Sequence, residues 1–163
     1  MRHTYPVLIL LLAGLGLWSC GPSGNAPRTP DGRPLTIMLL FNNGVTAETP
    51  RAHARRLTNV GEDVQERLIR RLTRAGYQVS VIQDRSQFAP APGYYLLYVE
   101  VTNYIYAFVS VTLNVRFDVM GTGPQPIASH ILAETSTRGL PRVIDTINGN
   151  LVITMTNALS QPH

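Results

Sequence analysis

Residues 68–82 read LIRRLTRAGYQVSVI, and this stretch decides the fold because a helical pattern changes to a strand pattern within it. Up to Ala75 the apolar residues recur every three or four positions, which is typical of one buried helix face. Gly76 is the residue type that most often ends a helix. Tyr77 to Ile82 then alternate in polarity and predict a strand.

The helix is predicted over residues 60–75. Asn59 and Glu62 stand three positions apart before its first turn and indicate a capping box. Acidic residues come early in this segment and arginines come late, an order that complements the helix dipole.

Upstream, residues 35–41 form an apolar run between Pro34 and an Asn-Asn-Gly turn and predict a buried strand. Residues 45–58 are predicted as a loop, with a helical turn starting at Thr49-Pro50. Strand, helix and strand form a βαβ unit, whose two strands should be parallel.

Residues 94–120 alternate strictly and predict a two-stranded ribbon with one buried and one wet face, turning near Tyr106-Ala107. Residues 127–137 predict a third antiparallel strand, and the period of residues 142–159 indicates a helix. The fold class is therefore α/β of the α+β two-layer type. We expect a mixed sheet of about five strands in the order β-α-β-β-β-α, with two helices packed on one face.

The amino-terminal residues 1–19 have a short basic start and an apolar run too short for a permanent membrane span, as in a secretory signal peptide. Cys20, the only cysteine, follows this run directly. One interpretation of this arrangement is an ordinary signal peptide followed by an unrelated cysteine. Residues 20–34 are rich in proline and glycine and predict a tether, so a single domain is expected over residues 35–160.

The segments Leu17-Trp18-Ser19-Cys20-Gly21, 68–79 and 95–101 together resemble small envelope lipoproteins of Gram-negative bacteria. That group includes a lipopolysaccharide-assembly lipoprotein, auxiliary lipoproteins of ABC-type lipid transport, and lipoproteins similar to the amino-terminal domain of the Tol-Pal propeller protein. The resemblance implies that Cys20 becomes the first mature residue and carries the lipid anchor, palmitate included. Gly21 in place of aspartate implies delivery to the outer membrane, at its periplasmic face.

All basic side chains apart from histidine are arginines, and seven of the fourteen fall between Arg51 and Arg74. Guanidinium groups bind phosphate and carboxylate in two-point fashion, so the late helical arginines are a candidate anion-binding site. The members of this candidate site are Arg67, Arg70, Arg71 and Arg74. The alternative is structural: i,i+4 pairs with Asp63 and Glu66, together with the helix dipole, explain the same cluster.

Tyrosines mark the polar face of the first ribbon strand. We expect them opposite its aliphatic face, where they would form a contact surface for a protein partner. The members of this candidate surface are Tyr94, Tyr98, Tyr104 and Tyr106. The alternative is the ordinary preference of tyrosine for strands.

No nucleophile elbow, phosphate-binding glycine loop or metal-ligand spacing is found, so we expect no enzyme, no metal and no cofactor. Nucleic acid is an unexpected partner for a secreted, lipidated chain. The expected function is an accessory or assembly factor that contacts a protein of an envelope transport, assembly or secretion system. The alternatives are a lipid or lipopolysaccharide carrier with an apolar cavity, and a purely structural lipoprotein.

Overall fold

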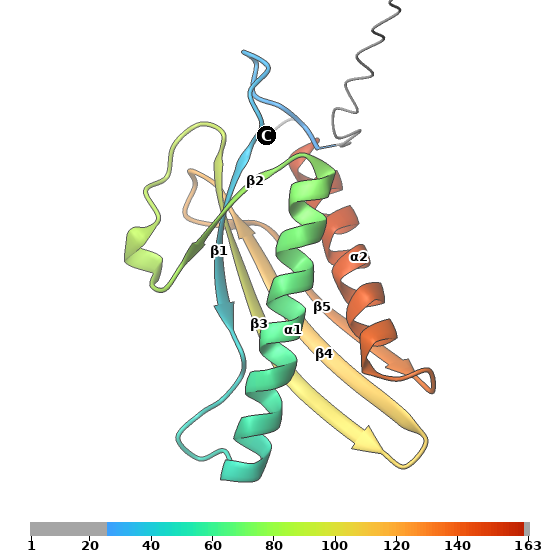
Figure 1. Ribbon diagram of the computed structural model, residues 1–163. Helices are drawn as coiled ribbons and strands as arrows, with labels where there is room; N and C mark the ends of the chain where they lie inside the picture. Colours follow the sequence, from blue (N-terminus) through green and yellow to red (C-terminus); the bar gives the residue numbers. More distant parts are fainter. Residues whose placement is uncertain (1–25, 162–163) are drawn as a thin grey trace, which may run out of the picture.

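Five strands and two α-helices account for most of residues 26–161, the part of the chain that the computed structural model describes (Figure 1). The predicted signal peptide and Cys20 lie outside the described residues. The elements are β1 (Thr36–Asn42), α1 (Arg51–Ala75), β2 (Gln78–Ile82), the 3₁₀ turn η1 (Arg85–Gln87), β3 (Tyr94–Ala107), β4 (Ser110–Met120), β5 (Pro126–Ser136) and α2 (Leu140–Leu159).

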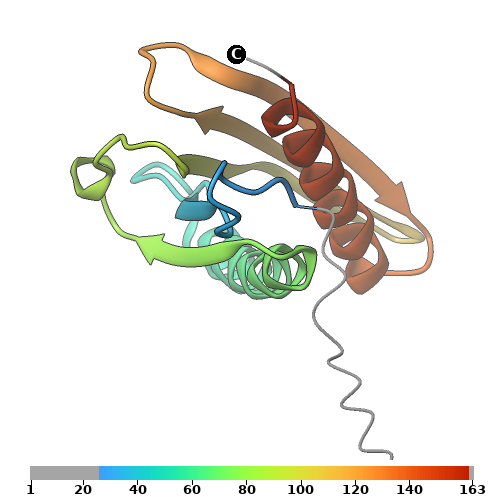
Figure 2. The ribbon, with the colours of Figure 1, turned by 90° about the horizontal axis from the view of Figure 1, so that it is seen from above.

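The strands form one mixed sheet in the order β2-β1-β3-β4-β5. β1 pairs in parallel with β2 and β3, whereas β4 pairs antiparallel with β3 and β5. Both helices cover the same face of the sheet, which we call the inner face: α1 contacts β2 and β3, and α2 contacts β4 and β5 (Figure 2). The predicted fold class, element order and placement of the helices are confirmed.

The core lies between the inner face and the helices. Every second residue of the central strands points toward the helices, and these residues are completely buried. From α2 the core receives the predicted helical stripe, including Ile144, Ile147, Leu151 and Met155. Asn148 is the buried polar residue of this interface, and its side-chain amide donates to the Val64 carbonyl of α1 at 3.0 Å. Neither helix of the described region is long and apolar enough to cross a membrane.

Helix α1 begins at Arg51, nine residues before the predicted start. The predicted loop over residues 45–58 is therefore wrong in its second half. The helical turn predicted to start at Thr49-Pro50 belongs to α1, whose N-cap residue is Pro50. Asn59 and Glu62 lie inside α1, so the capping box is wrong, and no acidic residue lies in the first turn. Residues 51–56 are mostly exposed, and the apolar period that reveals an amphipathic helix is absent there. Gly76 ends the helix as predicted, with a left-handed φ of 103°.

A β-bulge in β3 changes which residues face the helices. Val101 pairs with Val115, but the next pair is Asn103 with Asn114, so Thr102 is the extra residue. Beyond the bulge Tyr104 pairs with Leu113 on the inner face. The uninterrupted alternation predicted for this strand is therefore wrong.

The consequence is an exchange of faces in the last third of β3. Ile105, predicted on the buried aliphatic face, pairs with Thr112 on the outer face and is half exposed. Tyr106 pairs with the buried Val111 and lies on the helix side, past the end of the helical cover. Tyr104 and Tyr106, two of the four tyrosines predicted opposite the aliphatic face, therefore lie on the aliphatic face itself.

The outer face is not uniformly wet. Met38, Leu96 and Met120 pair across β1, β3 and β4 on this face, and Leu96 is buried. Arg85 of η1 donates to the Met120 sulfur at 3.1 Å, which brings the β2–β3 loop over this row. Figure 1 shows this loop at the edge of the sheet, beside β2.

Residues 26–34, predicted as part of the tether, lie against the domain. The Ala26 amide donates to the Ala75 carbonyl at the end of α1, at 3.1 Å, and Arg28 forms a bridge with Pro34. The part of the tether between Cys20 and the first described residue is therefore five residues long, 21–25.

Candidate functional site

The four tyrosines of the candidate contact surface do not form one surface. Tyr94 and Tyr98 lie on the outer face near the start of β3, where the Asn42 amide donates to the Tyr98 hydroxyl at 3.4 Å. Tyr104 is half-buried against the core. Tyr106 alone is largely exposed, at the far end of the strand. The bulge at Thr102 is the reason for this division.

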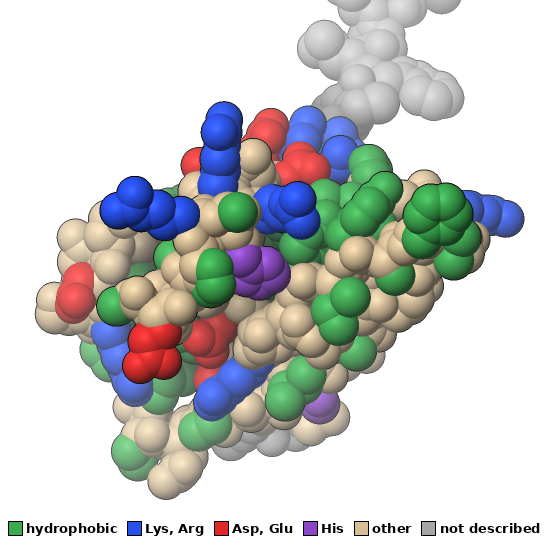
Figure 3. All heavy atoms as spheres, turned by 90° about the horizontal axis from the view of Figure 1, so that it is seen from below, with side chains coloured by type: hydrophobic (Ala, Val, Ile, Leu, Met, Phe, Trp, Pro, Cys, Tyr) green, Lys and Arg blue, Asp and Glu red, His purple; other side chains and the backbone are tan. Residues whose placement is uncertain are grey.

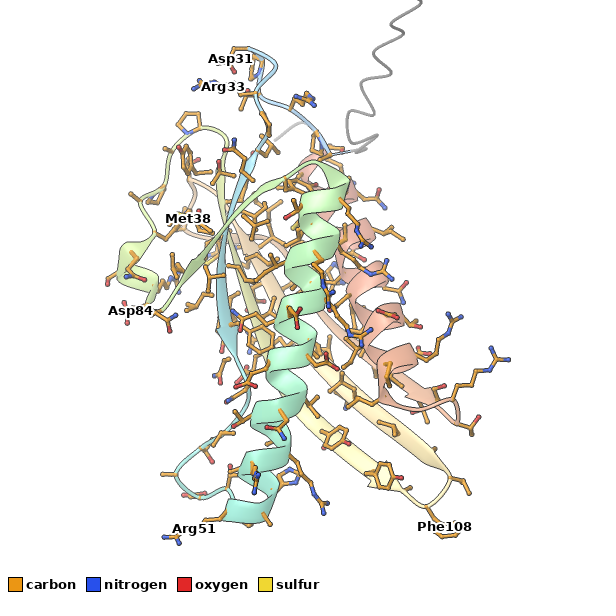
Figure 4. All side chains as sticks on the ribbon, in the orientation of Figure 1. Asp31, Arg33, Met38, Arg51, Asp84 and Phe108 are labelled. Carbon is orange, nitrogen blue, oxygen red and sulfur yellow. The ribbon has the colours of Figure 1, made fainter. Side chains whose placement is uncertain are left out.

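The far end of the β3–β4 ribbon carries a different apolar surface, which we call the hairpin tip. It consists of Ile105, Tyr106, Phe108 and Val109, with exposed fractions of 50, 68, 100 and 68%. The ribbon extends past the start of α2 at this end (Figure 1), and Phe108 projects from its turn (Figure 4). Figure 3 views the molecule from this side, with hydrophobic side chains in green among the exposed atoms. The hairpin tip is thus an exposed apolar surface.

The turn at the hairpin tip has an unusual composition. Ala107 pairs with Ser110, so Phe108 and Val109 form a two-residue hairpin loop. Such loops favour Asn-Gly or other residues that accept positive φ. Outside glycine no residue of the described chain has positive φ, so the loop adopts a less favoured backbone. Phe108 is fully exposed and Val109 is largely exposed. Neither turn geometry nor packing accounts for these two residues. Sequence analysis missed them, although the lack of an Asn-Gly signal was visible in the chain.

The four candidate arginines do come together. They line a groove of about 620 Å³ between α1 and α2, which we call the arginine groove. Its opposite wall is formed by Asp145, Gly149, Val152 and Ile153 of α2. Helical spacing places the arginines on one side of α1, and the absence of a side chain at Gly149 lets the Arg71 guanidinium approach the second helix.

The charges of the arginine groove are balanced at one end only. Arg67 donates to Asp63 at 3.3 Å and to Asp145 at 3.2 Å, and Arg70 pairs with Glu66 at 3.3 Å. Partial burial lowers the pKa of Arg67, but its hydrogen bonds to Asp63 and Asp145 raise the pKa by more than burial lowers it. The net change in pKa is therefore upward. The predicted i,i+4 pairs are therefore present.

Arg71 and Arg74 differ from these neighbours. Within residues 26–161 neither guanidinium group has an acidic partner, and both side chains are exposed. Residues 67–82 and 146–161 contain four arginines and no acidic residue. The structural alternative thus explains Arg67 and Arg70 but leaves Arg71 and Arg74 as available anion ligands.

The interior of the domain is filled. Phe117, Leu97, Leu113, Leu68 and Leu151 are all fully buried between the sheet and the helices. A lipid carrier requires apolar space of several hundred Å³ in that position. The arginine groove and the hollow at the β1–α1 junction lie outside this core, and both are lined by polar as well as apolar residues.

In the described part of the chain, no three residues of the types histidine, cysteine, aspartate and glutamate lie close enough together to hold a metal ion. His130 is exposed on β5 and stacks on Phe117 with ring centroids 5.5 Å apart.

Comparison with known proteins gives a likeness of fold. No family model and no curated protein sequence matches the chain. Similar solved structures include lipoprotein GNA1162 from Neisseria meningitidis, with 14% identity and a TM-score of 0.45 over 76% of this chain and 99% of that one. CT253 from Chlamydia trachomatis, described as a hypothetical protein, has 14% identity and a TM-score of 0.35 over 63 and 72%. A Helicobacter pylori protein proposed as a homolog of neuraminyllactose-binding hemagglutinin has 12% identity and a TM-score of 0.41 over 85 and 90%. At such identities the comparison concerns the fold alone.

Proposed function

We propose that this protein is a lipid-anchored, non-catalytic accessory factor of the bacterial envelope that binds a protein partner through its hairpin tip. Anchoring through Cys20 at the periplasmic face of the outer membrane is part of this proposal. The observation that carries it is the Phe108-Val109 turn, where two apolar side chains are exposed without a structural reason. Local rules broken without a gain in stability are typical of functional positions.

The arrangement of the chain supports this role. The described chain begins at Ala26 beside the end of α1, and the hairpin tip lies at the opposite end of the molecule (Figure 1). Fourteen residues of β3 lead from one end to the other, which corresponds to roughly 45 Å of extended strand. A domain tethered at the Ala26 end would thus hold the hairpin tip away from the bilayer, where a partner has access to it.

The test uses the lipidated full chain with an affinity tag, purified from solubilised membranes of its host. We expect one protein to co-purify in a fixed ratio with the wild type and with Ile131→Asn, and to be lost with Phe108→Asn/Val109→Gly. Ile131 is the matched control because it is 70% exposed on β5, away from the hairpin tip. Retention of the same partner by the double variant would refute a role of the hairpin tip.

A further inference from the structure

We propose that the arginine groove docks on the anionic phospholipid headgroups of the bilayer that holds the lipid anchor. The inference rests on the lipid attachment in the proposed function but concerns a different surface from the hairpin tip. It assigns the unpaired end of the groove, Arg71 and Arg74 with Ile153, to contact with the membrane itself.

The position of the groove relative to the chain start is the first reason. Ala26 hydrogen-bonds to Ala75, and Ala75 borders the arginine groove one residue beyond Arg74. Five residues separate Cys20 from Ala26, so the two lie at most about 20 Å apart when the chain is fully extended. A lipid on Cys20 would therefore keep this end of the groove close to the headgroups, at a high effective concentration.

The charge of this end is the second reason. Arg71 and Arg74 have no acidic partner in the described chain, and residues 67–82 and 146–161 contain no acidic residue. Asp31, the acidic residue of the segment 26–34 near this end, is paired with Arg33. Guanidinium groups bind phosphate oxygens in two-point fashion, and each basic residue near an anionic bilayer adds to its attraction.

The apolar part of the groove is the third reason. Ile153 projects from α2 beside these arginines with 60% of its surface exposed, and Val152 lies next to it. Basic residues that flank exposed aliphatic side chains are typical of surfaces that lie in the membrane interface. A soluble anion would use the arginines but would leave Ile153 without a role.

The experiment measures how close this end of the domain lies to the bilayer. The lipidated full chain carries Asn157→Cys, labelled with a donor dye, on the exposed side of α2; its own cysteine is blocked by the lipid. The protein is reconstituted in phosphatidylcholine vesicles with or without roughly 30 mol% phosphatidylglycerol and with a headgroup-labelled acceptor lipid. We expect energy transfer to rise with phosphatidylglycerol and to fall back in about 0.5 M salt, where charges are screened within a few Å.

Two charge-reversal variants make the result specific. Arg71→Glu/Arg74→Glu should abolish the phosphatidylglycerol-dependent rise, with docking weakened about fivefold for each arginine lost. Arg51→Glu/Arg55→Glu makes the same change of charge in exposed positions at the other end of α1 and should leave the rise intact. Transfer that is independent of phosphatidylglycerol, or lost equally in both variants, would overturn the inference. Failure of the wild type to join phosphatidylcholine vesicles would instead refute the lipid anchor, and an unchanged melting temperature verifies the fold of each variant.

Discussion

At the scale of single residues, Tyr77 connects the end of α1 to α2. Its ring is buried, and its hydroxyl shares a hydrogen bond of 2.9 Å with the Thr156 hydroxyl. Burial raises the pKa of Tyr77 above its ordinary value of 10.0, by more than the hydrogen bond to Thr156 lowers it. Tyr77 directly follows the Gly76 cap, so its contact with Thr156 fixes the junction between α1 and β2 against α2.

We expect Tyr77→Phe to lower the free energy of unfolding by about 1 kcal/mol at neutral pH because one hydrogen bond is lost. The raised pKa gives the pH dependence: above pH 10 the unfolded chain releases this proton while the folded chain retains it. The wild type therefore loses stability as the pH rises through that range, and the phenylalanine variant lacks this contribution. Urea titrations from pH 7 to 11 measure the difference, and a gap that widens with pH would contradict the account.

Two helical glycines have opposite surroundings and give a matched pair of variants. A Cβ at Gly61 would lie 2.7 Å from the Asn43 Cβ, whereas at Gly149 its nearest neighbour would be the mobile Arg71 guanidinium at 3.4 Å. We expect Gly61→Ala to destabilise the fold by about 1–3 kcal/mol through overpacking. Gly149→Ala should stabilise it by about 0.5–1 kcal/mol, because alanine favours helices. Thermal melts of both variants check these signs, and stabilisation by Gly61→Ala would contradict the close approach of α1 to the preceding loop.

At the scale of elements, the sequence predicted those features that burial imposes. The helical stripe of α2, the βαβ unit and the Gly76 cap all follow from period and from the geometry of helix ends. The first two turns of α1 bury few side chains, so the sequence has no apolar period there from which a helix could be predicted. The bulge at Thr102 results from a two-against-one pairing with β4, which the alternation of β3 alone does not record.

The bulge makes a testable distinction between two neighbouring tyrosines. Tyr104→Ser should destabilise the domain by about 2 kcal/mol because the ring packs on the core. Tyr106→Ser should change the stability by less than about 0.5 kcal/mol because most of its ring is in solvent. Denaturant midpoints of the two variants, compared with equal slopes, decide the point. Equal effects would mean that the strand lacks the bulge.

The two-residue turn of the ribbon is expected to trade stability for contact. Phe108→Asn/Val109→Gly supplies the residues that the loop length favours, so we expect the free energy of unfolding to rise by about 1 kcal/mol. The same variant should lose the partner. A less stable double variant would show that the apolar turn serves the fold itself.

At the scale of the whole molecule, the two candidate surfaces lie at opposite ends. The arginine groove reaches Ala75, whose carbonyl accepts from Ala26. The hairpin tip lies at the other end of the molecule, past the start of α2 (Figure 1). The arginines were visible in the sequence as a cluster, and the two helices bring them to one groove. The hairpin tip was not predicted, because the turn was expected near Tyr106-Ala107, whereas the pairing of Ala107 with Ser110 places it at Phe108-Val109.

The most direct test of the central claim is photo-crosslinking in intact host cells from position 108. Phe108 is replaced by p-benzoylphenylalanine, with the same replacement at Ile131 as the control on an exposed strand position. We predict a single light-dependent adduct of the lipidated protein with one envelope protein from position 108 and none from position 131. The absence of an adduct at position 108, or the same adduct from both positions, would contradict the claim that the hairpin tip is the partner-binding surface.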